Sequence, residues 1–159
     1  MRVDKLMTSP VHWCRPEDSL EYAARLMWDH DCGCIPVCSS TSDAMHATSV
    51  VTDRDICMCA LFTGKALRDL SVADAMAKDL LACSPSDSVE AAERTMREAH
   101  IRRLPVVDDE QTLLGMISLA DLAREAYREQ SQSQREITAR DICGTLAVIC
   151  EPEGHTPSP

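Results

Sequence analysis

Residues 14–20 read Cys-Arg-Pro-Glu-Asp-Ser-Leu, and residues 83–89 read Cys-Ser-Pro-Ser-Asp-Ser-Val. The cysteine, proline, aspartate and serine of the two stretches recur at an offset of 69 residues. Downstream, residues 51–56 (Val-Thr-Asp-Arg-Asp-Ile) match residues 117–122 (Ile-Ser-Leu-Ala-Asp-Leu) at an offset of 66. So long a period with this many matches indicates two copies of one supersecondary unit.

Each copy shows the same succession of hydrophobic patterns, which predicts the order β-α-β-β-α. Ser19 and Ser88, or the aspartate before each, are the expected N-caps of the first helix in each copy. One copy is too small to close its own core, so we expect an α/β (α+β) fold in which two copies pack sheet to sheet as one pseudo-symmetric module. The expected strands are 11–14, 35–38, 48–52, 80–83, 104–107 and 113–117, and the expected second helices are about 53–62 and 118–128.

The repeat sets the expected boundaries: a first domain at 1–66, a second at 67–129, and a linker with a C-terminal tail at 130–159. Residues 141–152 match residues 74–85 at an offset of 67, so the tail holds the start of a third copy. Only seven residues follow, too few to complete a unit. We expect this segment to form a lone strand or helix-strand that covers a sheet or dimer edge; a frayed end and a partner-docking tail are the alternatives.

The composition excludes several classes of protein. With 16 basic and 26 acidic residues the net charge is −10, which opposes binding to nucleic acid or to an anionic membrane surface. The chain opens Met-Arg-Val-Asp-Lys without an apolar leader, and no apolar stretch approaches the ~18 residues that a membrane span needs. We therefore expect a cytoplasmic protein, although its nine cysteines need an explanation.

One polar motif recurs where a strand leads into a helix. It consists of a hydroxyl residue followed three positions later by aspartate: Thr52 with Asp55, and Ser118 with Asp121. Such a turn places a hydroxyl and free N–H groups beside an anion, and the carboxylate can accept two hydrogen bonds from a ribose diol. The same residues are also good N-caps, so the motif alone leaves capping and ligand binding both open.

The repeated unit resembles the CBS domain, named for cystathionine β-synthase, and the tandem is similar to a Bateman module. The resemblance covers about residues 1–129 and is most specific at 101–108 and 114–118, with Asp121. The first copy is similar to small stand-alone bacterial CBS pairs of the hypoxic-response type. The resemblance implies that AMP, ATP or a related adenosyl compound binds between the paired domains, with Thr52, Asp55, Ser118 and Asp121 as anchors.

Basic residues extend this expectation. The resemblance implies that Arg102 and Arg103, just before the second strand of their copy, reach ligand phosphates, for which the arginine fork is suited. The alternative is that the pair is a solvated strand entrance. The first copy has Gly33 and Cys34 there, so Arg54 is its candidate phosphate contact instead. The two sites are therefore expected to differ. His12 is interpreted as a surface histidine, with a phosphate contact as the alternative.

Most cysteines are expected to be small core residues. Residues 30–38 (His-Asp-Cys-Gly-Cys-Ile-Pro-Val-Cys) lack the paired spacing of a zinc site, so no metal is expected. Cys14 and Cys38 end two strands that a β-α-β crossover makes neighbours, and a disulfide between them is a hypothesis for redox response. A reducing cytosol opposes that bond.

Three functions compete at this point. The first is a regulatory module that binds an adenine nucleotide, needs no resident cofactor and changes its contact with an effector protein. The second is a structural homodimer with empty clefts, assembled side-on into a flat disc as the resemblance implies. The third is a redox-responsive stress protein that uses the Cys14–Cys38 pair. No nucleophile–base pair is evident in the sequence, so an enzyme is not expected.

Overall fold

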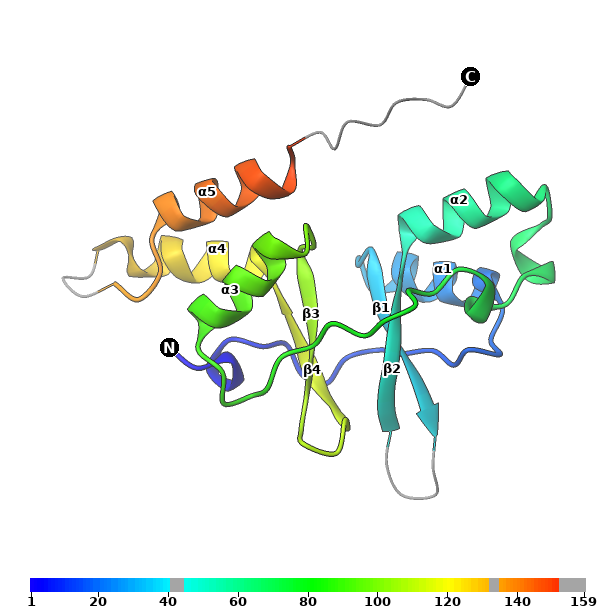
Figure 1. Ribbon diagram of the computed structural model, residues 1–159, viewed down its shortest axis with the longest axis horizontal. Helices are drawn as coiled ribbons and strands as arrows, with labels where there is room; N and C mark the ends of the chain where they lie inside the picture. The colour runs from blue at the N-terminus through cyan, green and yellow to red at the C-terminus, as the bar shows by residue number, and fades with distance from the viewer. Residues whose placement is uncertain (41–44, 132–134, 152–159) are drawn as a thin grey trace.

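The structure is a computed structural model that describes residues 1–40, 45–131 and 135–151. It has two halves of alternating helix and strand that lie side by side (Figure 1). The first half consists of α1 (Leu20–Asp29), β1 (Cys34–Ser40), β2 (Met45–Thr52) and α2 (Asp53–Thr63). The second consists of α3 (Val89–Glu98), β3 (Arg103–Val107), β4 (Leu113–Ser118) and α4 (Leu119–Arg128), and α5 (Ala139–Ile149) follows. The mixed α/β fold and the repeat are thus confirmed.

The helices begin where the sequence predicts. Ser19 accepts a hydrogen bond from the N–H of Tyr22 at 3.1 Å, and Ser88 accepts one from Ala91 at 3.1 Å. Each bond satisfies one of the backbone donors that a helix N-terminus leaves unpaired. Within each helix one face is buried and the opposite face is exposed; the buried residues are Leu20, Ala23 and Met27 in α1, and Val89, Ala92 and Met96 in α3.

Each half contains one antiparallel hairpin. In the first, Cys34 lies opposite Thr52 and Ile35 opposite Val51; in the second, Arg103 lies opposite Ser118. Both hairpins shift register at the same repeat position, between residues 37 and 38 and between 106 and 107. In each hairpin the register places the first residue of the first strand beside the last residue of the second strand. The hydroxyl residue of each motif is that last residue.

The expected first strands of the two copies are much shorter than predicted. Each is reduced to one parallel bridge, Cys14 with Val37 and Cys83 with Val106. The N–H of Cys14 donates to Pro36 at 3.1 Å, and the N–H of Cys38 donates to Cys14 at 2.8 Å. Prolines stop the ladder on both sides, because its extension would need an N–H from Pro36 in one direction and from Pro16 in the other.

The cores of the halves do not follow the sequence boundaries. The N-terminal Val3 is fully buried among second-half residues, and its N–H donates to the carbonyl of Asp87 at 2.9 Å. Conversely, Leu70 and Val72, from the segment that joins the halves, are buried in the first-half core. The two connecting segments therefore cross between halves, which ties the predicted domains 1–66 and 67–129 into one module.

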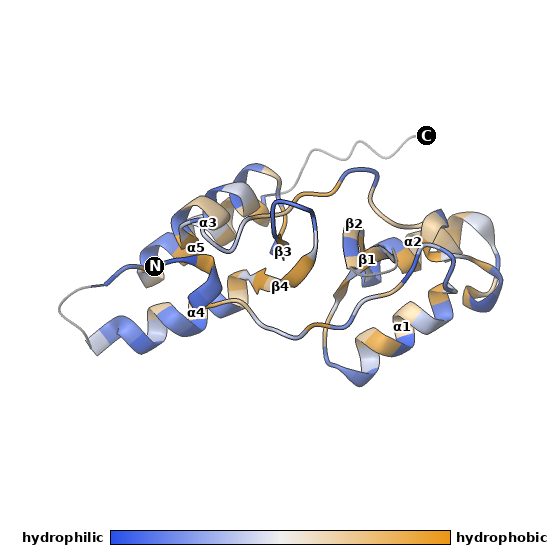
Figure 2. Cartoon of the chain, turned by 90° about the horizontal axis from the view of Figure 1, so that it is seen from below, coloured by the Kyte–Doolittle hydropathy of each residue, from blue (hydrophilic) through white to orange (hydrophobic). Residues whose placement is uncertain are grey.

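A third, smaller cluster joins the hairpins. Cys38 and Ala47 of the first half are buried together with Val107 of the second. The N–H of Ala47 also donates to the carbonyl of Gln111 at 2.9 Å. Figure 2 shows hydrophobic colour on β4 near the middle of the molecule and mostly hydrophilic colour along α4. The sheets thus meet, as expected, at the centre of the module.

The prediction for the tail was wrong. The segment forms the helix α5, which packs on α3 and α4, and not a strand at a sheet or dimer edge (Figure 1). Its likeness to residues 71–76 holds through the first turn, since Thr138 and Asp141 form the same capping box as Ser71 and Asp74. The third copy has no following strand to pair with, so the chain continues as a helix whose Ile142 and Thr145 are buried. Of the expected linker and tail, residues 132–134 and 152–159 lie outside the described residues.

Candidate functional site

The hydroxyl motifs form capping boxes at the N-termini of α2 and α4. The hydroxyl of Thr52 donates to Oδ2 of Asp55 at 2.6 Å, and the N–H of Asp55 donates back to Oγ1 of Thr52 at 3.2 Å. In the second half, Ser118 and Asp121 make the same contacts at 2.5 and 3.2 Å. The capping interpretation is therefore confirmed for both motifs. It leaves Oδ1 of each aspartate outside the box.

Two clefts flank the meeting point of the halves, at repeat-related positions. The first cleft, of about 400 Å³, is lined by Thr52 and Arg54 together with Arg102 and Arg103 of the other half. The second cleft, of about 420 Å³, is lined by Ser118 and Asp121 together with residues of the first half that include His12 and Cys34. Each cleft thus combines the motif of one half with the strand entrance of the other.

The clefts bring together most of the predicted site residues. Thr52, Arg54, Arg102 and Arg103 meet in the first cleft, and Arg103 also reaches the second. Asp55 is half-buried and does not line the first cleft; its neighbour Asp53 does. The arginine pair therefore faces the motif of the opposite copy, an arrangement that only the packing of the two halves determines.

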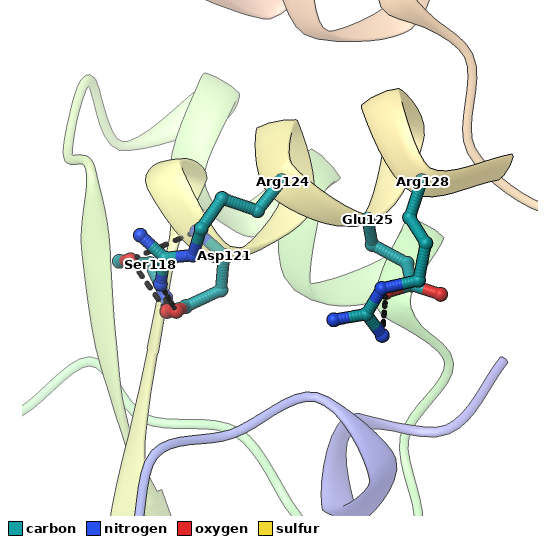
Figure 3. A network of polar contacts seen from close by, with 5 residues as sticks. All are labelled: Ser118, Asp121, Arg124, Glu125 and Arg128. Carbon is teal, nitrogen blue, oxygen red and sulfur yellow. Dashed lines mark hydrogen bonds and ion pairs between the residues drawn. The ribbon is translucent and has the colours of Figure 1, made fainter. Parts of the chain in front are cut away.

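One residue of the second cleft was missed by the sequence reasoning. Arg124, one turn along α4, forms an ion pair with Oδ1 of Asp121 and lines the cleft (Figure 3). Asp121 is almost fully buried, whereas 69% of the Arg124 side chain is exposed. The i, i+3 spacing could have indicated the pair. The first copy has Met58 at this position, so its aspartate has no matching partner.

A second pair on the same face of α4 continues this pattern. The guanidinium of Arg128 lies 2.8 Å from the carboxylate of Glu125 (Figure 3). The side chain of Glu125 is buried, whereas that of Arg128 is exposed. Because Glu125 lines neither cleft, we assign this pair to the support of α4 rather than to a ligand.

Histidines and cysteines line the far wall of the second cleft. The rings of His12 and His30 stack with centroids 3.4 Å apart, and both lie beside Cys32 and Cys34. His12 is exposed, as expected, and also faces the cleft. Within the described part of the chain, no group of three or more metal-binding side chains is placed to hold an ion.

The predicted disulfide partners are neighbours but not bonded. Cys14 and Cys38 are buried free thiols on adjacent segments joined by the 2.8 Å backbone hydrogen bond. Burial raises the pKa of Cys14 to about 12 and that of Cys38 to about 11. Because disulfide exchange needs the thiolate, both thiols are poorly reactive at neutral pH. The bond stays a prediction, which a count of free thiols in denaturant without reductant tests: nine would contradict it.

The repeat, the clefts and the motifs agree with a comparison to known families. The model of the CBS domain matches this chain twice, at residues 3–60 and 72–128. The chain belongs to the CBS domain family. The CBS domain-containing protein YhcV of Bacillus subtilis is 35% identical over 131 residues, which cover 81% of this chain and 88% of YhcV. No helix among the described residues is long and apolar enough to cross a membrane.

Two solved structures of CBS proteins are informative. The structure of CBSX2 in complex with AMP is 26% identical, has a TM-score of 0.69, and covers 81% of this chain and 98% of its own. Hypoxic Response Protein I, solved with two coordinated zinc ions, is 27% identical with a TM-score of 0.67, over 78% of this chain and 98% of its own. The expected similarity to the hypoxic-response type is confirmed.

Proposed function

We propose that this CBS pair is a regulatory module, not an enzyme, that binds an adenine nucleotide such as AMP or ATP between its halves. The observation that carries the proposal is that each cleft combines the hydroxyl residue of a motif with arginines: Thr52 with Arg102 and Arg103 of the other half in the first cleft, and Ser118 with Arg103 and Arg124 of its own half in the second. A nucleotide supplies the complementary groups, a ribose diol and a phosphate. The similarity to CBSX2, solved with AMP, supports the same ligand class.

The second cleft offers the fuller set of groups. Oδ2 of Asp121 accepts from Ser118, and its Oδ1 is held by the exposed Arg124. A ribose diol would replace the Arg124 guanidinium at Oδ1, and the freed guanidinium would lie in the cleft with Arg103, near the phosphate. Local arginines thereby offset the net charge of −10, because salt largely screens exposed charges that lie more than about 8 Å away.

The first cleft would bind by a different route. Its cations are Arg54, Arg102 and Arg103, while the aspartate of its motif does not reach the lining. We therefore expect phosphate contacts to dominate there and ribose contacts to dominate in the second cleft. This difference agrees with the expectation from sequence that the two sites are unequal.

Thermal denaturation of the whole chain tests the proposal. A ligand that binds only the folded state stabilises it, by about 2.7 kcal/mol at 100 times its dissociation constant. We expect AMP, ATP, NADH or S-adenosylmethionine to raise the melting temperature, and inorganic phosphate at equal concentration to raise it less. If none of the four nucleotides shifts the transition at millimolar concentration, the proposal is wrong.

We also propose that the protein is a homodimer, assembled through the helices of its first half. Trp28 and Phe62 are 87% and 80% exposed on α1 and α2, whereas the aligned positions of the second half carry Arg97 and Arg128. In the second half α5 packs on the corresponding helix pair, and Thr145 donates to Glu93 at 2.5 Å. A disc that buries both helix pairs would have to displace α5.

Trp28 and Phe62 can each bury roughly 150–250 Å² of surface in an interface. Counted over both protomers and together with their neighbours, this approaches the ~1,000 Å² of total surface that a specific interface buries. Analytical ultracentrifugation should show a dimer that Trp28→Arg with Phe62→Arg converts to a monomer. The matched change on the second half, Tyr127→Arg, should leave the dimer intact. A wild-type monomer would contradict this part of the proposal, as would a dimer insensitive to the double change.

In this account the nucleotide changes the contact that the dimer makes with an effector protein. A cytoplasmic location is part of the proposal, because a reducing compartment keeps the buried cysteines as thiols. The alternative, a structural dimer with empty clefts, predicts the same ultracentrifugation result and no response to any nucleotide.

A further inference from the structure

Arg103 occupies a special position between the two clefts. It lies at the start of β3 opposite Ser118, and its side chain lines both the first and the second cleft. Its neighbour Arg102 lines the first cleft but not the second. A guanidinium of Arg102 also donates to the sulfur of Cys150 at 3.3 Å, at the end of α5. Within the described ranges of the chain the side chain of Arg103 makes no hydrogen bond or ion pair, so its fork is available to a ligand.

The repeat does not provide a second copy of this cation. Cys34 is the residue of the first half that aligns with Arg103. Cys34 is buried and lies near Arg103. Burial raises the pKa of the Cys34 thiol to about 11, against the opposing effect of Arg103, so the thiol is neutral at pH 7. At this repeat position the two clefts therefore share one arginine, Arg103, where a symmetric module would have two.

We propose that the two clefts compete for Arg103, so that a phosphate-bearing ligand in one cleft weakens the binding of a second ligand in the other. This inference rests on the proposed function and adds its regulation: one chain binds one nucleotide tightly and the next one weakly. The guanidinium cannot direct its fork to phosphates in both clefts at once. Loss of one charge-assisted hydrogen-bonding group corresponds to roughly 10- to 100-fold in affinity.

Closing one cleft at a time tests whether Arg103 serves both. Ala77 lines the first cleft, and Thr8, its repeat equivalent, lines the second. Ala77→Trp and Thr8→Trp should each fill one cleft and leave the other open to AMP, measured by titration calorimetry on the full chain. Both positions are at least partly exposed, so the bulkier side chain should be tolerated.

In both closed-cleft backgrounds, Arg103→Ala should weaken AMP binding by roughly 10- to 100-fold. Arg102→Ala should weaken it only when the first cleft is the open one. Arg97→Ala removes an exposed charge on α3, outside both clefts, and should change neither affinity. An effect of Arg103→Ala confined to one background would overturn the inference.

The unmodified clefts provide the second test. We expect the wild-type chain to bind a first AMP at least about 10-fold more tightly than a second, and Cys34→Arg, which supplies the missing cation, to bring the two affinities together. Two equal, independent sites in the wild type would refute the sharing of Arg103 while supporting the proposed function. Absence of AMP binding in the wild type would refute the proposed function itself, and the inference with it.

Discussion

The capping role and the ligand role of Asp121 can be separated, because the chain contains the same capping box away from the clefts. At the start of α5, the hydroxyl of Thr138 donates to Oδ2 of Asp141 at 2.6 Å, and the N–H of Asp141 donates back at 3.3 Å. The corresponding distances in the Ser118–Asp121 box are 2.5 and 3.2 Å. Asp141 is exposed and lines neither cleft. Asp141→Ala is therefore a matched control for Asp121→Ala.

The two changes should have similar effects on stability. Loss of the box costs about 1 kcal/mol in either case. Asp121→Ala also removes the ion pair with Arg124, which adds no more than about 1 kcal/mol because 69% of the arginine side chain is exposed to solvent. Urea denaturation at neutral pH should therefore show that the two variants are folded and differ by about 1 kcal/mol or less in the free energy of unfolding.

The effects on nucleotide binding should differ strongly. A ribose diol that donates two hydrogen bonds to the Asp121 carboxylate contributes about 3 kcal/mol or more, so Asp121→Ala should weaken AMP binding in the second cleft by at least about 100-fold. Asp141→Ala should leave calorimetric AMP binding unchanged. Equal AMP affinities of the two variants would contradict a ligand role for Asp121, which would then be a helix cap and nothing more.

Three further predictions concern stability, measured by urea denaturation. Burial raises the pKa of four thiols, those of Cys14, Cys34, Cys38 and Cys83, from the 9.0 of an exposed cysteine to about 11–12. Their contribution to stability is therefore complete below about pH 9 and is lost as the pH rises towards 11–12, so that at pH 10 each thiol should lower the free energy of unfolding by about 1.4 kcal/mol. A stability that stays constant up to pH 10 would contradict the burial of these thiols. Gly115→Ala places a Cβ 2.7 Å from the carbonyl oxygen of Thr8 and should destabilise the protein by about 1–3 kcal/mol, whereas unchanged stability would show that the N-terminal segment does not lie against β4. Ile142→Ala empties a buried position on α5 and should cost about 2 kcal/mol or more, and no loss would mean that α5 does not dock on α3 and α4.

Local features of the fold were predictable from sequence. The N-caps Ser19, Ser88, Thr52 and Ser118 were all among the residues expected to cap, because capping depends on residues within one turn of the helix start. The hairpins follow from two apolar runs separated by a short polar turn. The first strand of each copy was predicted too long. In the first copy Pro36 and Pro16 lack the N–H groups that a longer ladder would need, and the sequence alone did not show that these two residues would have to donate.

Features that depend on packing between the halves were not predictable. The motif identified Thr52 and Ser118, but only the pseudo-symmetric packing shows that Arg102 and Arg103 face the opposite motif. Residues 141–152 match residues 74–85, which include a predicted strand, yet in the tail the chain forms a helix because no strand is available to pair with it. Arg124 shows the opposite case: its spacing from Asp121 was visible, but its place in the cleft was not.

In equilibrium dialysis of the full, unmodified chain against AMP, we expect saturable binding, with a first AMP bound at low concentration and a second at least about 10-fold more weakly. Equal AMP concentrations on both sides of the membrane, up to millimolar ligand, would contradict the claim that the clefts of this CBS pair bind AMP.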